Sequence, residues 1–214
     1  MEVKSAEYVA TYVDVKKCPE TFMPEYALIG RSNVGKSSLI NYICNHKGLA
    51  KVSGTPGKTQ TINYFVINNT WHLVDLPGYG YARRSMSERK KWTTMIENYL
   101  IHRKQLQYVF ILVDSRIPPQ QTDLNFISFL GERNLPFVIV FTKADKPGGK
   151  EALYNIELFK RKLQEEWDEL PDMFVTSSER RYGKEILLAF INESNKEFST
   201  SGKKRMEERD EEEE

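Results

Sequence analysis

Eight residues near the start of the chain constrain its fold more than any other feature. Residues 30–37, G-R-S-N-V-G-K-S, fit the pattern G-x-x-x-x-G-K-[ST]. An apolar run over 26–29 precedes them, and apolar residues at helical spacing follow within 36–45. Glycines between a strand and a helix let the backbone curl, so that its N–H groups and the helix N-terminus surround an anion. The order strand, loop, helix therefore predicts a phosphate-binding loop at one edge of an α/β sheet.

The phosphate-binding loop carries two side chains with distinct tasks. Lys36 can reach the β- and γ-phosphates of a nucleotide, and the Ser37 hydroxyl can ligate Mg²⁺. The motif alone indicates a nucleoside triphosphate but not which base. The residues expected to contact the nucleotide here are Gly30, Arg31, Ser32, Asn33, Val34, Gly35, Lys36, Ser37 and Ser38.

Apolar residues alternate between strand and helix spacing along the rest of the chain. Strands are expected over 62–67, 71–74, 108–113, 137–141 and 173–175, and helices over 87–102, 120–133, 150–169 and 183–197. Asn68 and Asn69 predict a hairpin turn, and Ser87 is a candidate N-cap. This alternation predicts a three-layer α/β fold, with a mostly parallel sheet and helices on both faces. Such sheets bind ligands beyond the carboxyl ends of their strands.

A second motif, far along the chain, can distinguish guanine from adenine. Thr142, Lys143 and Asp145 form T-K-x-D directly after the predicted strand 137–141. A carboxylate there can accept hydrogen bonds from N1–H and the 2-amino group of guanine, whereas adenine offers neither donor and leaves a buried charge unpaired. The Lys143 stem can lie along the purine face. The loop after the last strand supplies further candidates for binding guanine O6, namely Thr176, Ser177 and Ser178.

Two further loops can sense the third phosphate. Asp75 follows the predicted strand 71–74 and can hold Mg²⁺ through a water, and the Gly78 N–H can meet the γ-phosphate. In the loop 54–59 and just after it, either Thr59 or Thr61 can supply a metal ligand; Thr59 is our first choice, but the sequence does not separate them. Ordinary turn chemistry is the competing interpretation. The nucleotide-binding candidates in these loops are Gly57, Lys58, Thr59, Asp75 and Gly78.

Composition and charge narrow the kinds of protein that this chain can be. The chain has 214 residues and a net charge of +1, and no apolar run approaches the roughly 18 residues needed to cross a membrane. Cys18 and Cys44 stand in no Cys/His cluster, which argues against a zinc site or disulfides and favours the cytoplasm. Cys44 lies on an apolar helix face and is expected to pack. Residues 203–214 include four basic and seven acidic residues, so we expect one domain over 1–198 and a disordered acidic tail over 199–214.

Six segments together resemble the EngB (YihA/YsxC) family of bacterial GTPases, in the TRAFAC class of P-loop proteins. They are GRSNVGKSSLIN (30–41), TPGKTQTINYF (55–65), DLPGYGYA (75–82), VDSRIPPQ (113–120), TKADK (142–146) and TSS (176–178). DLPGYGYA and TPGKTQ are specific to that family rather than general GTPase features. The resemblance implies a single GTP-binding domain that acts in assembly of the large ribosomal subunit, with an added antiparallel strand. We expect a cytoplasmic monomer with Mg²⁺ as cofactor.

Two positions bear on hydrolysis. Ras-like enzymes place a glutamine directly after the DxxG glycine to orient the attacking water, and here that position is Tyr79. We therefore expect slow intrinsic hydrolysis, completed by another residue, a cation or a partner. In related GTPases an asparagine at the Asn33 position helps to bind K⁺, so K⁺ binding is a hypothesis here, and a structural cap is the alternative role. No catalytic residue is identified, and the candidates for supporting roles are Asn33, Thr59 and Gly78.

Basic residues gather after the γ-phosphate loop and beside the guanine loop. They are Arg83, Arg84, Arg89, Lys90, Lys91, His102, Arg103, Lys104, Arg180 and Arg181. A basic surface next to a nucleotide-sensing loop can couple the phosphate state to contact with ribosomal RNA; a solvated helix face is the alternative. A P-loop kinase or ATPase is disfavoured by Lys143 with Asp145. An RNA-binding module that ignores nucleotide is disfavoured by the intact Lys36, Ser37 and Asp75.

Overall fold

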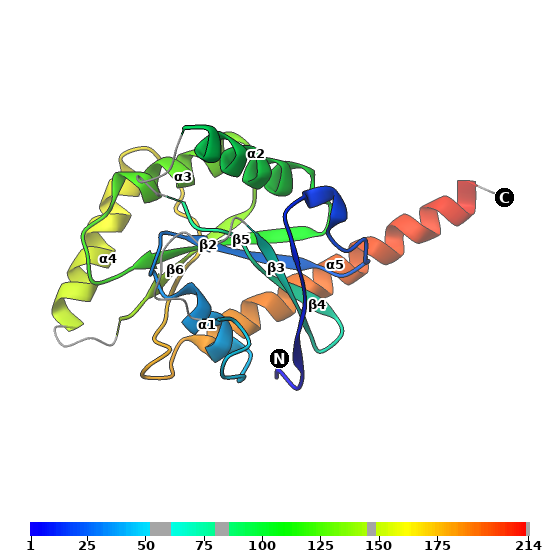
Figure 1. Cartoon of the computed structure of the whole chain (residues 1–214), viewed down its shortest axis with the longest axis horizontal. Coiled ribbons are helices and arrows are strands. Elements are labelled where there is room, and N and C mark those ends of the chain that lie inside the picture. The colour runs from blue at the N-terminus through cyan, green and yellow to red at the C-terminus, as the bar shows by residue number, and fades with distance from the viewer. Residues whose placement is uncertain (52–60, 80–85, 145–148, 213–214) are drawn as a thin grey trace.

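The computed structural model describes residues 1–51, 61–79, 86–144 and 149–212, without the side chains of 86–89, 149 and 202–212. Its strands are β1 (Ala6–Tyr12), β2 (Glu25–Gly30), β3 (Ile62–Ile67), β4 (Trp71–Asp75), β5 (Leu106–Asp114), β6 (Phe137–Thr142) and β7 (Met173–Val175). Its helices are the 3-10 helix η1 (Val15–Lys17) and α1 (Lys36–Ile43), α2 (Met86–His102), α3 (Gln121–Glu132), α4 (Gly149–Gln164) and α5 (Lys184–Glu212). Figure 1 shows the helices on both sides of a central sheet.

The strands form one sheet in the order β1-β3-β4-β2-β5-β6-β7. Strands β4, β2, β5, β6 and β7 are parallel, and β3 is antiparallel to both β4 and β1. The predicted mostly parallel sheet with an added antiparallel strand is confirmed. The β3–β4 turn is also confirmed, because Asn68 and Asn69 have φ angles of 52° and 53°, as a type I′ turn requires.

The apolar pattern of the sequence does not predict strand β1. None of its seven residues is fully buried, and its pairing with β3 is interrupted by a register shift between Tyr8 and Ala10. An exposed edge strand with a bulge lacks the period-two burial that makes a strand recognisable. The antiparallel part of the sheet therefore has two strands beyond the parallel core, β1 and β3.

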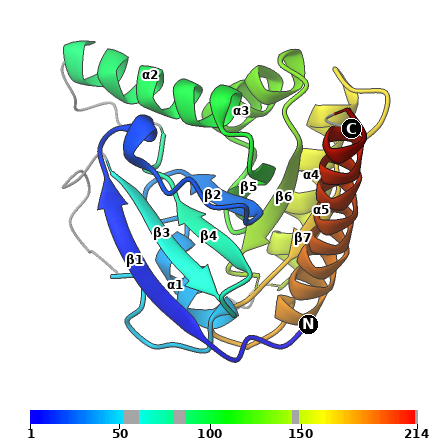
Figure 2. The same cartoon turned by 90° about the vertical axis from the view of Figure 1, so that its right-hand side faces the viewer.

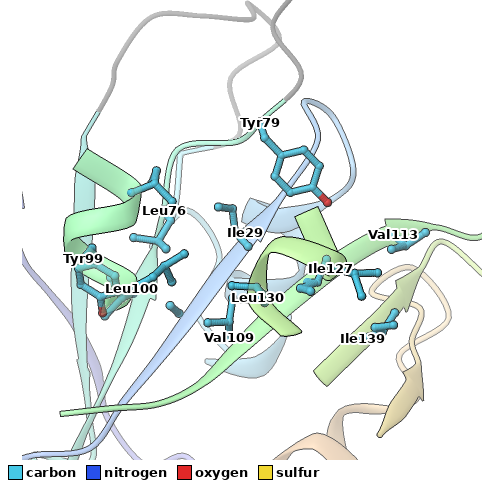
Figure 3. Packing of buried hydrophobic residues seen from close by; sticks show 14 of the residues in the cluster. Ile29, Leu76, Tyr79, Tyr99, Leu100, Val109, Val113, Ile127, Leu130 and Ile139 are labelled. Carbon is cyan, nitrogen blue, oxygen red and sulfur yellow. The ribbon is translucent and has the colours of Figure 1, made fainter. Parts of the chain in front are cut away.

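Alternate residues of the central strand β2 enter two separate cores. Ala27 and Ile29 pack in the core beneath α2, α3 and α4, whereas Tyr26 and Leu28 pack in the core beneath α1 and α5. Figure 2 shows how the helices are arranged around the sheet, and Figure 3 shows part of the first core, with Ile29 near α3 residues such as Ile127. Because every parallel strand is covered on both faces, each appears in the sequence as a continuous apolar run.

Most of the expected helices and strands agree with the structure to within a few residues, and three of the differences concern residues named in the prediction. Ser87 lies within α2 rather than before it, so it is not the N-cap. Helix α4 ends at Gln164, and Trp167 packs beyond it on Phe137, with ring centroids 5.7 Å apart. Helix α5 continues to Glu212, past the expected helix end at residue 197, because its Lys-, Arg- and Glu-rich sequence has high helix propensity. The division into a domain over 1–198 and an acidic tail over 199–214 stays a prediction.

Both cysteines are buried and free, as the packing prediction for Cys44 requires. Burial raises the pKa of the Cys44 thiol to about 12, which keeps it protonated and unreactive. None of the helices that the structure describes is long and apolar enough to cross a membrane.

Candidate nucleotide-binding site

The phosphate-binding loop joins the carboxyl end of β2 to α1, and its backbone curls as predicted. Asn33 and Gly35 both have positive φ angles, 60° and 103°, which turn successive peptide groups toward one side. Gly30 lies so close to β5 that a Cβ there would be 2.7 Å from the Leu112 carbonyl oxygen. A side chain at Gly30 would therefore push the loop away from the central strands.

Lys36 and Asp75 meet at the start of α1. The Lys36 ammonium donates to Asp75 Oδ1, and the Asn63 amide donates to Asp75 Oδ2 at 3.3 Å. Ser37 is the next residue of α1 and carries a hydroxyl oxygen, the second predicted Mg²⁺ ligand of this end of the helix. Oxygen donors of these two kinds suit Mg²⁺, which P-loop GTPases use, and they would hold it together with the phosphates. No cluster of three or more His, Cys, Asp or Glu side chains suited to a metal occurs in the described part of the chain.

Gly78 packs directly against the phosphate-binding loop. A Cβ at Gly78 would lie 2.5 Å from the Gly30 carbonyl oxygen, and the next residue, Tyr79, pairs with Arg31 in a parallel bridge. The segment after β4 is therefore fixed at the same edge as the loop. The contact of the Gly78 N–H with a third phosphate stays a prediction.

Tyr79 is buried rather than open to an attacking water. Its residue is 5% exposed, and its ring stacks on Phe126 of α3 with centroids 4.7 Å apart. The Tyr79 hydroxyl donates to Asp123 Oδ1 at 2.9 Å, and Arg31 Nε donates to both oxygens of the same carboxylate at 3.0 Å. Figure 3 shows the Tyr79 ring pointing toward α3.

The pKa values of this buried group follow from its surroundings. Burial raises the pKa of Asp123, while the Arg31 charge and the Tyr79 hydrogen bond act to lower it. Burial and the neighbouring Asp123 charge raise the pKa of Tyr79 well above its ordinary value, so its hydroxyl remains a donor. Asp123 was not among the residues predicted from the sequence; its only sequence signal is an acidic residue in line with the buried Ile127 and Leu130 of α3.

The residues of the base-reading motif also support the phosphate-binding loop. The Thr142 hydroxyl donates to the Val34 carbonyl oxygen at 2.6 Å. Lys143 has a φ angle of 60° and turns back over the loop, where its ammonium donates to the Asn33 carbonyl oxygen and, at 2.9 Å, to Asp114 Oδ2. Hydrogen bonding thus joins the two motifs that the sequence places far apart.

Asp114 was not predicted from the sequence, although it lies in the V-D-S-R segment. Burial acts to raise its pKa, but hydrogen bonds from Arg116 and Lys143 prevail and lower the pKa to about 2. The ionised carboxylate therefore anchors the Lys143 ammonium beside the loop. An acidic residue at the end of a buried strand is the sequence signal that could have identified it.

The three predicted residues of the loop after β7 differ in burial. Thr176 and Ser177 are both buried, and their hydroxyl oxygens are engaged: Thr176 donates to the Phe141 carbonyl oxygen at 3.1 Å, and Ser177 accepts from the Arg180 N–H at 2.8 Å. Ser178 instead lines the cavity described next. Only Ser178 of the three thus offers its side chain to a ligand here.

A cavity of about 850 Å³ lies between α1, Lys143 and the loop after β7. Its size suits a nucleotide. The predicted residues that line it are Gly35, Ser38, Thr142, Lys143 and Ser178. Three cationic residues also line it, namely Lys47, Arg116 and Arg181. Lys47 and Arg116 were not predicted as site residues, and Arg181 was predicted to belong to a basic surface.

Four predicted site residues lie outside the described part of the chain, namely Gly57, Lys58, Thr59 and Asp145. Thr61, the alternative to Thr59 as metal ligand, is buried and 7% exposed. The choice between these two threonines and the guanine-reading role of Asp145 stay predictions.

The curled loop, the adjacent lysine and carboxylate, and their place at the carboxyl edge of a mostly parallel sheet define a P-loop nucleotide-binding protein. A family model described as "50S ribosome-binding GTPase" matches residues 25–143. Probable GTP-binding proteins EngB from Bacteroides fragilis and Porphyromonas gingivalis are each 54% identical over 94% of this chain and 100% of their own length. The chain belongs to the EngB family of GTP-binding proteins, and it is a GTPase.

A solved structure of a probable GTP-binding protein engB supports the fold. It matches with a TM-score of 0.59 at 23% identity, over 81% of this chain and 99% of that chain. At this level of identity the likeness shows the shared architecture, while the family membership rests on the sequence matches.

Proposed function

We propose that this GTPase is a nucleotide-controlled factor that binds the large ribosomal subunit in the cytoplasm, as a monomer, and takes part in its assembly. The family match supports ribosome binding, since the matching family is described as ribosome-binding. Within the structure, the observation that carries the proposal is a groove lined by basic residues. It lies beside the helix that follows the γ-phosphate segment, residues 75–79. Figures 1 and 2 show η1 beside this helix, α2.

Apolar and cationic side chains both line the groove. It encloses about 790 Å³ between the segment 13–16 and α2. Its apolar lining residues are Val13, Val15 and Met95, and Val13 is 68% exposed. The titratable lining residues are Asp14, Lys16, Lys90, Lys91 and His102. Exposed lysines beside one another favour contact with RNA phosphates, whereas a single acidic side chain offsets little of that charge.

Arg103 does not belong to the basic surface on which its sequence position suggested it would lie. Its side chain is 8% exposed and forms an ion pair with Glu25 at 2.6 Å. Of the other predicted basic residues, Arg83 and Arg84 lie outside the described residues, as does the side chain of Arg89. Lys90, Lys91, His102 and Lys104 remain as the exposed basic residues of α2 and its end.

Binding to isolated large subunits tests the groove. Sedimentation at several salt concentrations, with a non-hydrolysable GTP analogue, should show weaker binding by a Lys90→Ala/Lys91→Ala variant. Its salt slope should be shallower by about 0.7–0.9 for each RNA phosphate that a lysine no longer neutralises. The matched control is Lys160→Ala/Lys162→Ala, which removes two exposed lysines from α4. Equal binding by both variants, or equal binding with GDP, would contradict the proposal.

Guanine specificity is proposed to rest on Asp145. The anchored Lys143 supports it, because Lys143 lines the cavity and stands two residues before Asp145 in the sequence. GTP and GDP should raise the melting temperature, and ATP and XTP should not. Asp145→Asn should reverse the preference in favour of XTP, since the amide can pair with a 2-oxo group. If the Asp145→Asn variant still prefers GTP, Asp145 does not read the guanine base.

Intrinsic hydrolysis is proposed to be slow, because the buried Tyr79 hydroxyl is engaged by Asp123 and cannot orient a water. Asn33 is proposed to help bind K⁺ beside the phosphates. In its support, the Asn33 side chain is exposed on the curled loop. Turnover should be faster in K⁺ than in Na⁺ buffer, and Asn33→Ala should abolish the difference. Equal rates of the unmodified protein in both buffers would exclude the K⁺ role.

A further inference from the structure

Asp123 is a fully buried carboxylate on α3, with 0% exposure, and none of the nucleotide-binding roles above uses it. It lies in the first turn of the helix, where its N–H donates to the Gln120 carbonyl oxygen at 2.9 Å. The helix dipole favours a negative charge at that end. A buried carboxylate nevertheless loses its hydration, so partners must compensate it. Its hydrogen-bond partners come from the phosphate-binding loop and from the segment directly after β4.

One partner, Arg31, belongs to the phosphate-binding loop, and the other, Tyr79, belongs to the γ-phosphate segment (residues 75–79). Arg31 Nε donates to both carboxylate oxygens at 3.0 Å, and the Tyr79 hydroxyl donates to Oδ1 at 2.9 Å. The two partner residues also pair with each other through their backbones in the parallel bridge. Gly78 is consequently fixed between β4 and the Asp123 contact, against the Gly30 carbonyl oxygen.

We propose that Asp123 is a positioning residue for the third phosphate: by binding Arg31 and Tyr79 together, it keeps the Gly78 backbone at the phosphate-binding loop. Asp123 acts through these two residues and does not touch the nucleotide. The role does not depend on ribosome binding. It rests on the predicted contact between the Gly78 N–H and the γ-phosphate, and on the buried contacts among α3, the loop and the segment after β4.

The position of Gly78 matters to GTP and not to GDP. The phosphate-binding loop and the base-reading residues can contact both nucleotides, whereas the Gly78 N–H is placed to meet only the γ-phosphate. Loss of the Asp123 charge should therefore weaken the binding of a GTP analogue selectively. A residue that merely stabilised the fold would change both affinities alike.

The test compares affinities for GDP and a non-hydrolysable GTP analogue by calorimetry in Mg²⁺ buffer. Asp123→Asn retains the size of the side chain but loses its charge. It should weaken analogue binding by about tenfold relative to GDP, the size of effect expected from one charge-assisted hydrogen bond. Tyr79→Phe keeps the ring stacked on Phe126 and removes only the hydroxyl, so it should shift the same ratio by about threefold.

The matched control is Glu132→Gln, which neutralises an exposed carboxylate at the other end of α3. Its affinity ratio should equal that of the unmodified protein. Equal losses for both nucleotides in Asp123→Asn, or an unchanged ratio in Tyr79→Phe, would overturn the proposal. If Asp123→Asn fails to fold, Tyr79→Phe decides alone, because it leaves the Asp123–Arg31 ion pair in place.

Discussion

The buried ion pair between Glu25 and Arg103 offers a sharp test of how the sheet holds α2. Glu25, at the start of β2, is 0% exposed and accepts hydrogen bonds from Arg103 Nη2 at 2.6 Å and from Nε at 2.9 and 3.0 Å. The hydroxyls of Tyr99 and Tyr64 donate to the same carboxylate at 2.8 and 3.1 Å. The carboxylate is thus satisfied by a cation just after α2, a tyrosine of α2 and a tyrosine of β3.

Arg103→Met removes the cation and leaves the carboxylate buried. Removing one partner of a buried pair costs about 3–5 kcal/mol of unfolding free energy. The two tyrosine hydroxyls continue to donate to Glu25, so we expect a loss at the lower end, about 3 kcal/mol. For a domain of this size that corresponds to a melting temperature lower by about 6–12 °C.

Urea unfolding followed by circular dichroism measures the loss. The control, Lys196→Met, breaks an exposed pair with Glu193 and should leave the unfolding free energy nearly unchanged. The double variant Glu25→Gln/Arg103→Met leaves no unpaired charge and should recover part of the loss. A cost for Arg103→Met equal to that of the surface control would refute the reasoning.

Three further predictions concern the nucleotide edge and α2. Gly78→Ala places a Cβ 2.5 Å from the Gly30 carbonyl oxygen, so calorimetry should show weaker binding of a GTP analogue with little change for GDP. Because the pKa of Asp114 is lowered from 3.8 to about 2, its stabilising effect is complete above about pH 4 and is lost as the pH falls toward 2; the difference in urea stability between the protein and Asp114→Asn should shrink over that range. Hydrogen exchange at the start of α2 should differ between GTP-analogue and GDP complexes, whereas its carboxyl end, fixed by Arg103, should not change.

The strands and phosphate-contacting loops could be predicted because their sequence signals are local. Strands covered on both faces are continuous apolar runs, and the loops follow them directly, as 30–37 follows β2. The curl at Asn33 and Gly35 follows from short-range backbone preferences. Each of these features is decided by residues within about one turn of one another.

The buried polar contacts could not be predicted, because each joins residues that only the fold brings together. Asp123 is 92 residues from Arg31, and Glu25 is 78 residues from Arg103. In sequence, an isolated Asp or Arg in a helix resembles a solvated surface residue, and this is why Arg103 was placed on the basic surface. Strand β1 was missed for a related reason, since an exposed edge strand has no apolar pattern of its own.

Tyr79 stands directly after Gly78, where Ras-like enzymes have a glutamine. The sequence predicts only what Tyr79 does not do, because a phenol there cannot replace the glutamine that orients water. The structure gives the physical reason for a large aromatic residue at this point: the ring fills space over Phe126, and its hydroxyl reaches Asp123. A glutamine amide could reach one of these partners, but it could not also stack on Phe126. The Tyr79 side chain therefore holds the segment after β4 against α3, and we expect hydrolysis to use another group to orient the water.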